Sequence, residues 1–252
     1  MKTSILILGL SMTAPVFGLS LSEADLLAAQ AEKHYAAGDH AEALSLLDSV
    51  NTTFTSSALL FNMGNCHFKL GDIPQAILHY ERALRLAPGD ADVRSNLELA
   101  RQNVVDRVNE LPAFSLGSTW GRLRGGRDAD QWARRSLWSC LLIFVSLAAA
   151  ILVVNRALRR TLYGAASVFV IITVVSVAFA AFRAEEVTDD SEAIIVGAKV
   201  DVRSEPRPNT TVLFVLHKGT KVTVLQEQGG WSEVQLSNGN VGWMPPATLE
   251  RI

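Results

Sequence analysis

The chain has 252 residues, of which 49% are hydrophobic, and its formal net charge is −2. A protein that binds nucleic acid needs a basic face, so this near-neutral balance argues against that class. The two cysteines, Cys66 and Cys140, lie in a predicted helix and in a long apolar stretch. They are too differently placed to pair, and we expect folding not to depend on a disulfide.

The N-terminal segment has the composition of an export signal. One lysine precedes an apolar run from Ile5 to about Phe17, and small residues follow that run. The run is too short to cross a bilayer alone, and Val16-Phe17-Gly18 loosely fits a small-residue cleavage rule. We therefore predict a cleaved signal peptide over residues 1–18. An uncleaved anchor and a first packing helix of the next domain are the alternatives.

An internal repeat follows the N-terminal segment. Residues 34–44 (HYAAGDHAEAL) recur as residues 67–77 (HFKLGDIPQAI), a shift of 33 positions. Both copies carry a Gly-Asp turn and then an alanine. Glycine relieves a tight turn, and a small alanine lets the second helix pack closely on the first. The pattern predicts pairs of antiparallel helices.

This pattern resembles the tetratricopeptide repeat. Residues 57–90 match it almost throughout, residues 24–56 match it more weakly, and residues 91–107 start a third unit without a second helix. The matching residues of the strong unit are Leu60, Met63, Gly64, His67, Ala76, Tyr80, Ala83 and Pro88. The resemblance implies an all-α domain over residues 24–107, with two repeats and a cap helix. Since about three units are usually needed for stability, we expect this domain to lean on the membrane surface, on the C-terminal module or on a partner.

The resemblance also implies a peptide-binding groove on the inner face of each repeat's first helix. Carried over one by one, its positions are Glu32, Tyr35, Phe61, Asn62, Asn65, Phe68, Lys69, Asn96 and Asn103, with Asn62 and Asn96 at the edge. Asparagine is disfavoured inside helices, and paired amides can hydrogen-bond an extended peptide. The alternative is that these asparagines are solvated surface residues. We expect His34 and His67 to be packing residues of the core, not metal ligands.

Residues 108–135 approach the first apolar stretch. They hold Pro112 and four glycines, and tryptophans stand near arginines in and just after the segment. Indole and guanidinium groups suit the membrane–water interface. We predict an interfacial segment that hinges the repeats onto the bilayer, and a plain flexible linker is the alternative.

Two stretches, residues 136–154 and 162–182, contain no charged residue. As helices they would cover about 28–32 Å, which matches a bilayer core of about 30 Å. Soluble helices show a polar stripe, and these show none, so a buried hairpin of a soluble protein is the weaker alternative. We predict two transmembrane helices over these residues.

The flanking charges predict an orientation. The loop 155–161 carries three arginines and no acid, as a cytoplasmic loop does, and an acidic linker over 183–192 follows the second span. With an exported N-terminus, this orientation places both soluble domains in the periplasm of a bacterium, anchored in its inner membrane. Five arginines before the first span argue against it: Arg122, Arg124, Arg127, Arg134 and Arg135.

From residue 193 the apolar period changes to that of strands. Short alternating or continuous apolar runs are separated by turns rich in glycine, proline and asparagine, which predicts a small all-β barrel over residues 193–252. We expect Trp231 and Trp243 to supply much of its core, with Trp243 more a core residue than a ligand platform.

The order of residues in this segment resembles bacterial SH3-like domains. The matching stretches are 200–204 (VDVRS), 216–219 (LHKG), 230–231 (GW) and 239–243 (GNVGW). Glu205 stands where a glycine is usual, which puts the geometry of that turn in question. The ligand of this module stays open among a cell-wall peptide, a protein and none.

The sequence contains no recognisable catalytic motif. Phosphate-binding, nucleophile-elbow and zinc-protease patterns are absent, and no His/Cys/Asp cluster has metal-ligand spacing. We expect no enzyme, no cofactor and no metal. The predicted fold class is a multidomain membrane protein with helical repeats, a transmembrane hairpin and an SH3-like barrel.

This domain order resembles the BatE-like proteins of the Bacteroides aerotolerance operon. The resemblance implies a membrane-bound adaptor that works with a MoxR-type ATPase and von Willebrand factor A proteins in oxygen tolerance or envelope stress. The residues alone support only the adaptor function, in which the groove of the repeats binds a segment of a protein partner. The alternative is a cell-wall-binding or envelope-sensing protein, whose barrel binds peptidoglycan. A membrane enzyme or channel ranks third, because two spans without a buried ionisable residue leave no evident polar path.

Overall fold

The computed structural model describes residues 19–106 and 125–252. The predicted signal peptide and residues 108–124 of the predicted interfacial segment lie outside the described residues. The chain forms two compact units, divided after Thr55, which are taken in turn.

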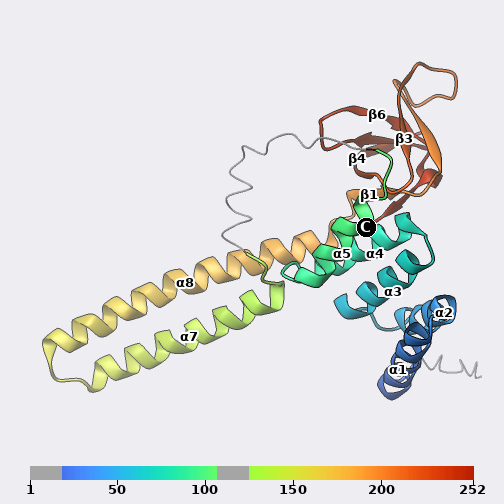
Figure 1. Ribbon diagram of the computed structural model, residues 1–252. Helices are drawn as coiled ribbons and strands as arrows, with labels where there is room; N and C mark the ends of the chain where they lie inside the picture. The colour runs from blue at the N-terminus through green and yellow to red at the C-terminus, as the bar shows by residue number, and fades with distance from the viewer. Residues whose placement is uncertain (1–18, 107–124) are drawn as a thin grey trace, which may run out of the picture. The chain divides into compact units, whose positions relative to one another are not determined.

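The first unit is a helical pair, α1 (Leu21–Ala37) and α2 (His40–Asn51) (Figure 1). Helix α1 begins with a capping box, in which Ser20 Oγ accepts a bond from Glu23 N and the Glu23 carboxylate accepts one from Ser20 N. It ends at Gly38, whose φ of 92° is open to glycine at little cost. The side chains buried in this pair are small or aliphatic: Ala24, Ala31, Ala43, Leu47 and Val50.

The second unit begins with three helices, α3 (Ser57–Lys69), α4 (Ile73–Leu86) and α5 (Ala91–Arg101). Ser56 caps α3 and Asp90 caps α5 through side-chain oxygens that accept backbone N–H groups. Helix α5 ends at Arg101, so the predicted cap helix stops short of its expected end.

The internal repeat of the sequence recurs in the geometry of the two turns. Asp39 N donates to His34 O at 2.9 Å, and Asp72 N donates to His67 O at 2.9 Å. Each aspartate also lies 3.5 Å from Nδ1 of the same histidine. The His67 side chain is 15% exposed, as a packing residue should be, but that of His34 is 42% exposed. The expectation that His34 is a core residue is therefore wrong: the ring of His67 is also covered by that of His79 of α4, 5.1 Å away, whereas the ring of His34 stays 42% exposed.

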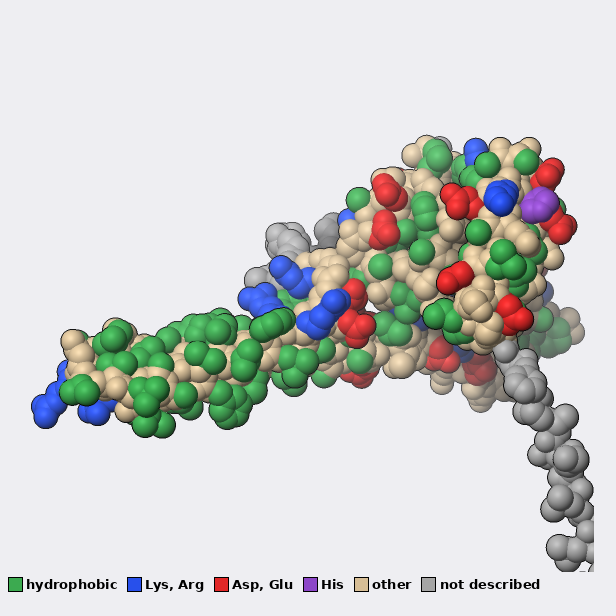
Figure 2. Space-filling model, turned by 90° about the horizontal axis from the view of Figure 1, so that it is seen from below, with side chains coloured by type: hydrophobic (Ala, Val, Ile, Leu, Met, Phe, Trp, Pro, Cys, Tyr) green, Lys and Arg blue, Asp and Glu red, His purple; other side chains and the backbone are tan. Residues whose placement is uncertain are grey.

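A helical hairpin, α7 (Ala129–Leu152) and α8 (Arg156–Thr188), follows in the second unit. Both helices are long and apolar enough to cross a membrane, with mean hydropathy of 2.0 and 2.5 in their most apolar windows. Only 17% of each window is buried within the protein. Figure 2 shows apolar side chains along the hairpin and basic side chains at its far end. By length and composition, the hairpin has the surface of a membrane-inserted element.

Helix α8 runs beyond its predicted apolar stretch at both ends, whereas α7 begins before residue 136 and ends at Leu152, short of the predicted residue 154. The predicted loop 155–161 is helical from Arg156, because Asn155 Oδ1 caps α8 by accepting from Ala157 N at 2.9 Å. The predicted acidic linker 183–192 is likewise helical up to Thr188. Capping residues set the ends of a helix, whereas the apolar stretch marks only the part that favours lipid.

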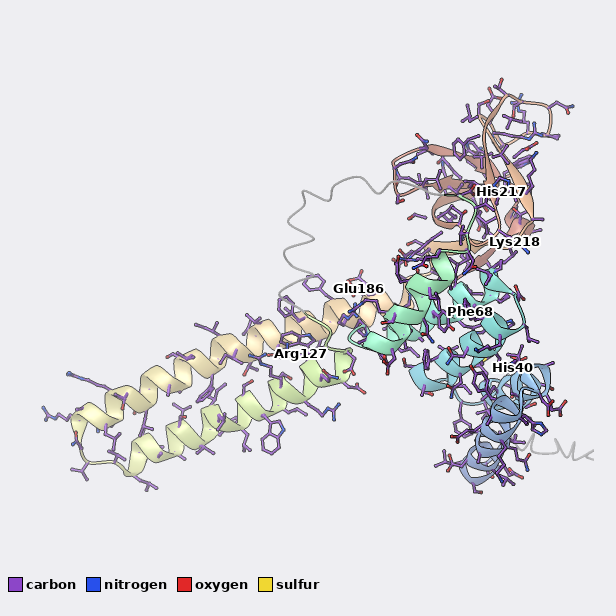
Figure 3. The ribbon with its side chains drawn as sticks, viewed as in Figure 1. His40, Phe68, Arg127, Glu186, His217 and Lys218 are labelled. Carbon is purple, nitrogen blue, oxygen red and sulfur yellow. The ribbon has the colours of Figure 1, made fainter. Side chains whose placement is uncertain are left out.

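Trp132 joins the two helices of the hairpin. Its ring is 3% exposed and meets the ring of Phe179 edge-on, with centroids 4.9 Å apart. The guanidinium carbons of Arg127 (Figure 3) and Arg135 each lie 5.3 Å from the indole centroid. This indole is therefore covered by protein, whereas Trp138 is 68% exposed on the same helix.

The C-terminal segment forms one antiparallel sheet in the order β3-β2-β6-β5-β4-β1-β7, which we call the C-terminal sheet. Its strands are β1 (Glu192–Ile195), β2 (Lys199–Arg203), β3 (Val212–His217), β4 (Lys221–Gln228), β5 (Trp231–Gln235), β6 (Val241–Met244) and β7 (Leu249–Arg251). Gly242 lets β2 and β6 approach closely, since a Cβ there would lie 2.5 Å from Val202 Cγ1. No described non-glycine residue has a positive φ, so Glu205 is accommodated without backbone strain.

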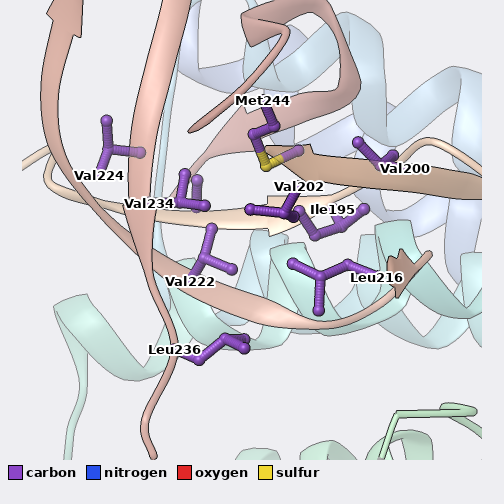
Figure 4. Close-up of a cluster of buried hydrophobic side chains, with 10 residues drawn as sticks. Ile195, Val200, Val202, Leu216, Val222, Val224, Val234, Leu236 and Met244 are labelled. Carbon is purple, nitrogen blue, oxygen red and sulfur yellow. The ribbon is translucent and has the colours of Figure 1, made fainter. Parts of the chain in front are cut away.

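The core of the C-terminal sheet is aliphatic (Figure 4). Its members are Ala193, Ile195, Val200, Val202, Leu216, Val222, Val224, Val234, Leu236 and Met244. The expectation that tryptophans supply much of this core is wrong. On β5 the buried positions are Ser232 and Val234, so alternation turns Trp231 to the other face, where it is half-buried. Trp243 is buried as expected, at 7% exposed, but it lies opposite Glu233 on that same outer face and outside the aliphatic cluster.

Candidate functional site

Five of the predicted groove residues lie on α3: Phe61, Asn62, Asn65, Phe68 and Lys69. Their spacing of one, three, three and one residues places them on one side of the helix. Asn62 and Lys69 are exposed, and the other three, including Phe68 (Figure 3), are half-buried. This side of α3 therefore combines apolar rings with hydrogen-bond donors that reach solvent.

Asn65 is held by bonds from two other helices. Its Oδ1 accepts a hydrogen bond from Tyr80 Oη of α4 at 2.7 Å and another from Asn96 Nδ2 of α5 at 2.8 Å. No described residue accepts a bond from its own amide nitrogen, which leaves two N–H donors for a ligand. The side chain is thus fixed in orientation, with its donors unused.

Tyr80 forms the floor beneath this amide. Its ring is 1% exposed and lies 5.9 Å, centroid to centroid, from that of Phe61. A Cβ on Gly64 would come within 2.6 Å of the ring, so glycine on α3 is what lets Tyr80 reach Asn65. Packing of α3 on α4 and the orientation of the candidate site therefore depend on the same contact.

The other predicted groove residues have different surroundings. Asn96 belongs to the Asn65 network, whereas Asn103 lies beyond the end of α5 and donates to Leu99 O at 3.0 Å. Glu32 is exposed on α1, and Tyr35 packs its ring against His40 at 4.9 Å. These last two residues belong to the first unit, and the structure brings together only the α3 and α5 members.

Two stacked histidines lie between α3 and α4. The rings of His67 and His79 are 5.1 Å apart and inclined by 12°. Burial, together with the nearby His67 and Arg82, lowers the pKa of His79 from 6.5 to about 4. His79 is therefore neutral at physiological pH. Within residues 19–106 and 125–252, no group of three His, Cys, Asp or Glu side chains could hold a metal ion.

Comparison with known families supports two of these segments. The model of the tetratricopeptide repeat matches residues 57–90, and that of the bacterial SH3 domain matches residues 198–250. The chain contains a tetratricopeptide repeat and a bacterial SH3 domain. The predicted first repeat, residues 24–56, lies outside the matched residues. A search of curated proteins gives no match.

The sequence predicted the candidate groove of the tetratricopeptide repeat but not its network. The sequence gives Tyr80 only as a position of the repeat pattern, and Asn96 only as a residue at the edge of the groove. The Tyr80 hydroxyl was the one clue to this network in the sequence, because a buried tyrosine needs a hydrogen-bond partner and a buried phenylalanine does not.

Proposed function

We propose that this chain is a non-enzymatic, membrane-anchored adaptor that binds a protein segment on one side of α3. We call this side the groove face; its residues are Phe61, Asn62, Asn65, Phe68 and Lys69. The observation that carries the proposal is the fixed amide of Asn65, whose oxygen is occupied by Tyr80 and Asn96 while its nitrogen is free to donate. A donor held in place before binding loses little entropy when a ligand arrives.

The chemistry of this face favours an extended segment rich in acceptors. Asn62 and Asn65 offer amide donors, Lys69 offers an ammonium group, and the rings of Phe61 and Phe68 offer apolar contact. Backbone carbonyls and side-chain carboxylates are the groups that such donors bind.

The test compares partner capture by full-length protein in detergent. The bait is offered a MoxR-type ATPase and von Willebrand factor A proteins from the same cells, together with solubilised membranes. We expect Asn62→Ala and Lys69→Ala each to weaken capture of the same partner by about 1–2 kcal/mol, or roughly five- to thirty-fold. Asn209→Ala, in an exposed turn of the SH3 domain, is the matched control and should bind normally.

Asn65 needs a different substitution, because alanine would leave the buried Tyr80 hydroxyl without an acceptor. Asn65→Asp keeps an oxygen for Tyr80 and Asn96, removes the N–H donors and adds a negative charge. We expect it to retain the fold and to lose capture. If capture is unchanged in Asn62→Ala, Lys69→Ala and Asn65→Asp, the groove face is not the binding site.

We further propose the setting of this adaptor. The order of signal peptide, helical repeats, apolar hairpin and SH3 domain resembles BatE-like proteins, which supports a role in an aerotolerance or envelope-stress complex. The two apolar helices support a membrane anchor by their length and composition. We place it in the bacterial inner membrane, with both soluble parts in the periplasm, because the loop between the apolar stretches is basic.

A second candidate function is binding of peptidoglycan, favoured by the bacterial SH3 domain. Apolar side chains stand exposed on its strands: Val212 at 41%, Leu213 at 51% and Leu225 at 48%. If this domain binds the cell wall, full-length protein in detergent should sediment with purified murein. The substitution Leu213→Ser should reduce the bound fraction severalfold. If the protein does not sediment with murein, peptidoglycan binding is excluded and only the adaptor function remains.

A further inference from the structure

The outer face of strand β1 is buried although it points away from the core of the sheet. Ala193 and Ile195 belong to the aliphatic core, and alternation turns Ile194 to the opposite face. Ile194 is nevertheless 0% exposed. Strand β1 contacts helix α4 as well as its neighbours β4 and β7. Helix α4 therefore accounts for the cover over this face.

Charged residues stand on both sides of Ile194. Lys221 of β4 and Glu250 of β7 are its direct partners across the sheet, so the three side chains form one outward row. Lys221 Nζ lies 3.1 Å from Glu81 Oε2 of α4. Glu250 accepts a bond from Gln75 Nε2 of α4 at 2.8 Å.

A second set of bonds joins α4 to the ends of β1 and β7. Arg85 lies 3.3 Å from the Glu192 carboxylate and donates to Ile252 O at 2.7 Å. Arg82 donates to Arg251 O at 2.5 Å and lies 3.4 Å from Glu250. Because Arg85 is only 14% exposed, its bonds are less screened than those of a surface pair.

The residues of α4 that make these bonds share one face. Gln75, Arg82 and Arg85, with the fully buried Leu78 between them, are spaced three, four and three residues apart. Tyr80 lies outside this row and packs on α3. Helix α4 thus presents one face to α3 within the repeat and a second face to the C-terminal sheet.

We propose that the outward row of Lys221, Ile194 and Glu250 is a docking surface for the second face of α4 in the same chain. The sheet then covers a face of the repeat at residues 57–90 that a following repeat would otherwise cover. The contact has one buried isoleucine at its centre and ion pairs around it. Its formation should therefore depend on the positions of these side chains and on the sign of their charges. A partner of the repeat has access to the groove face and not to this face of α4.

Cross-linking of full-length protein in detergent tests this contact. Cysteines are placed at Gln75 and Glu250 in a background with Cys66→Ala and Cys140→Ala, and a short thiol-to-thiol cross-linker is added. We expect a product within one chain, identified by mass spectrometry on a mixture of isotope-labelled and unlabelled protein. The control pair, Gln75→Cys with Arg207→Cys in the β2–β3 turn, should give none. Products between chains, or equal yields from both pairs, would overturn the proposal.

Charge substitution tests the ion pairs in the same cross-linking background. Arg85→Glu should abolish the product, because it opposes Glu192 and removes the bond to Ile252 O. Arg85→Lys keeps the charge and should retain the product. Circular dichroism of both variants shows that the helices are intact. A product that survives Arg85→Glu with an intact fold would show that this network does not hold the sheet on α4.

Discussion

Position 64 shows how one missing side chain orients a site. A Cβ on Gly64 would lie 2.6 Å from Tyr80 Cε1, and the ring is buried and cannot move aside. We therefore expect Gly64→Ala to lower the free energy of unfolding by about 1–3 kcal/mol, the usual cost of overpacking. Chemical denaturation in detergent measures this change.

Gly164 provides the matched control for that substitution. It is also inside a helix, but a Cβ there meets nothing within 4 Å. Gly164→Ala should be neutral or slightly stabilising, since alanine is the better helix former. A neutral or stabilising effect of both substitutions would mean that helix propensity, not the Tyr80 contact, governs position 64.

His79 should make stability depend on pH. The folded protein lowers its pKa from 6.5 to about 4, chiefly through burial, so the unfolded chain binds the proton more readily. The contribution is fully present above pH 6.5 and is lost as the pH falls toward 4, by about 3 kcal/mol in total. Denaturant unfolding at a series of pH values between these limits measures it.

Substitution of His79 separates its contribution from that of other groups. Among the described residues its Nδ1 has no hydrogen-bond partner, so His79→Leu removes the titration without breaking a bond. This variant should show a flatter pH profile between 6.5 and 4. An unchanged slope in His79→Leu would exclude His79 as its source.

At the scale of helices and strands, the sequence predicted the features that depend on residues close together in the chain. The Gly-Asp turns, the apolar stretches of α7 and α8 and the alternation in β2 and β4 each arise from residues close in sequence. Helix ends were less predictable, because Asn155 caps α8 inside a segment whose charges indicated a loop. The core of the C-terminal sheet was predicted wrongly because the prediction used the size of the tryptophan side chains. Strand alternation decides which face each side chain occupies.

Asp106 illustrates what sequence patterns could not predict. Burial tends to raise the pKa of this carboxyl, but bonds from His217 N, His217 Nδ1 and Thr220 Oγ1 lower it overall. The partners lie more than a hundred positions away along the chain. Asn65 and Asn96 are 31 positions apart, and α4 and β1 are separated by more than a hundred; both contacts exist only once the fold has formed.

For the whole molecule, the decisive prediction concerns sidedness. Single cysteines are placed at Ser45, Ala157 and Ser237, which are all exposed, so protein burial should not hinder labelling. In intact spheroplasts an impermeant thiol reagent should label the first and third only, because the basic end of the hairpin stays in the cytoplasm. Labelling of Ala157→Cys, or of only one soluble part, would contradict the proposed orientation.

The single oxygen of Asn65 joins the two helices of the repeat, α3 and α4, to the following helix α5. A ligand that draws on the nitrogen of the same amide polarises that oxygen and strengthens the bonds it receives. A ligand bound to α3 would therefore strengthen the hydrogen bonds that hold α4 and α5, without contacting the surfaces of these two helices.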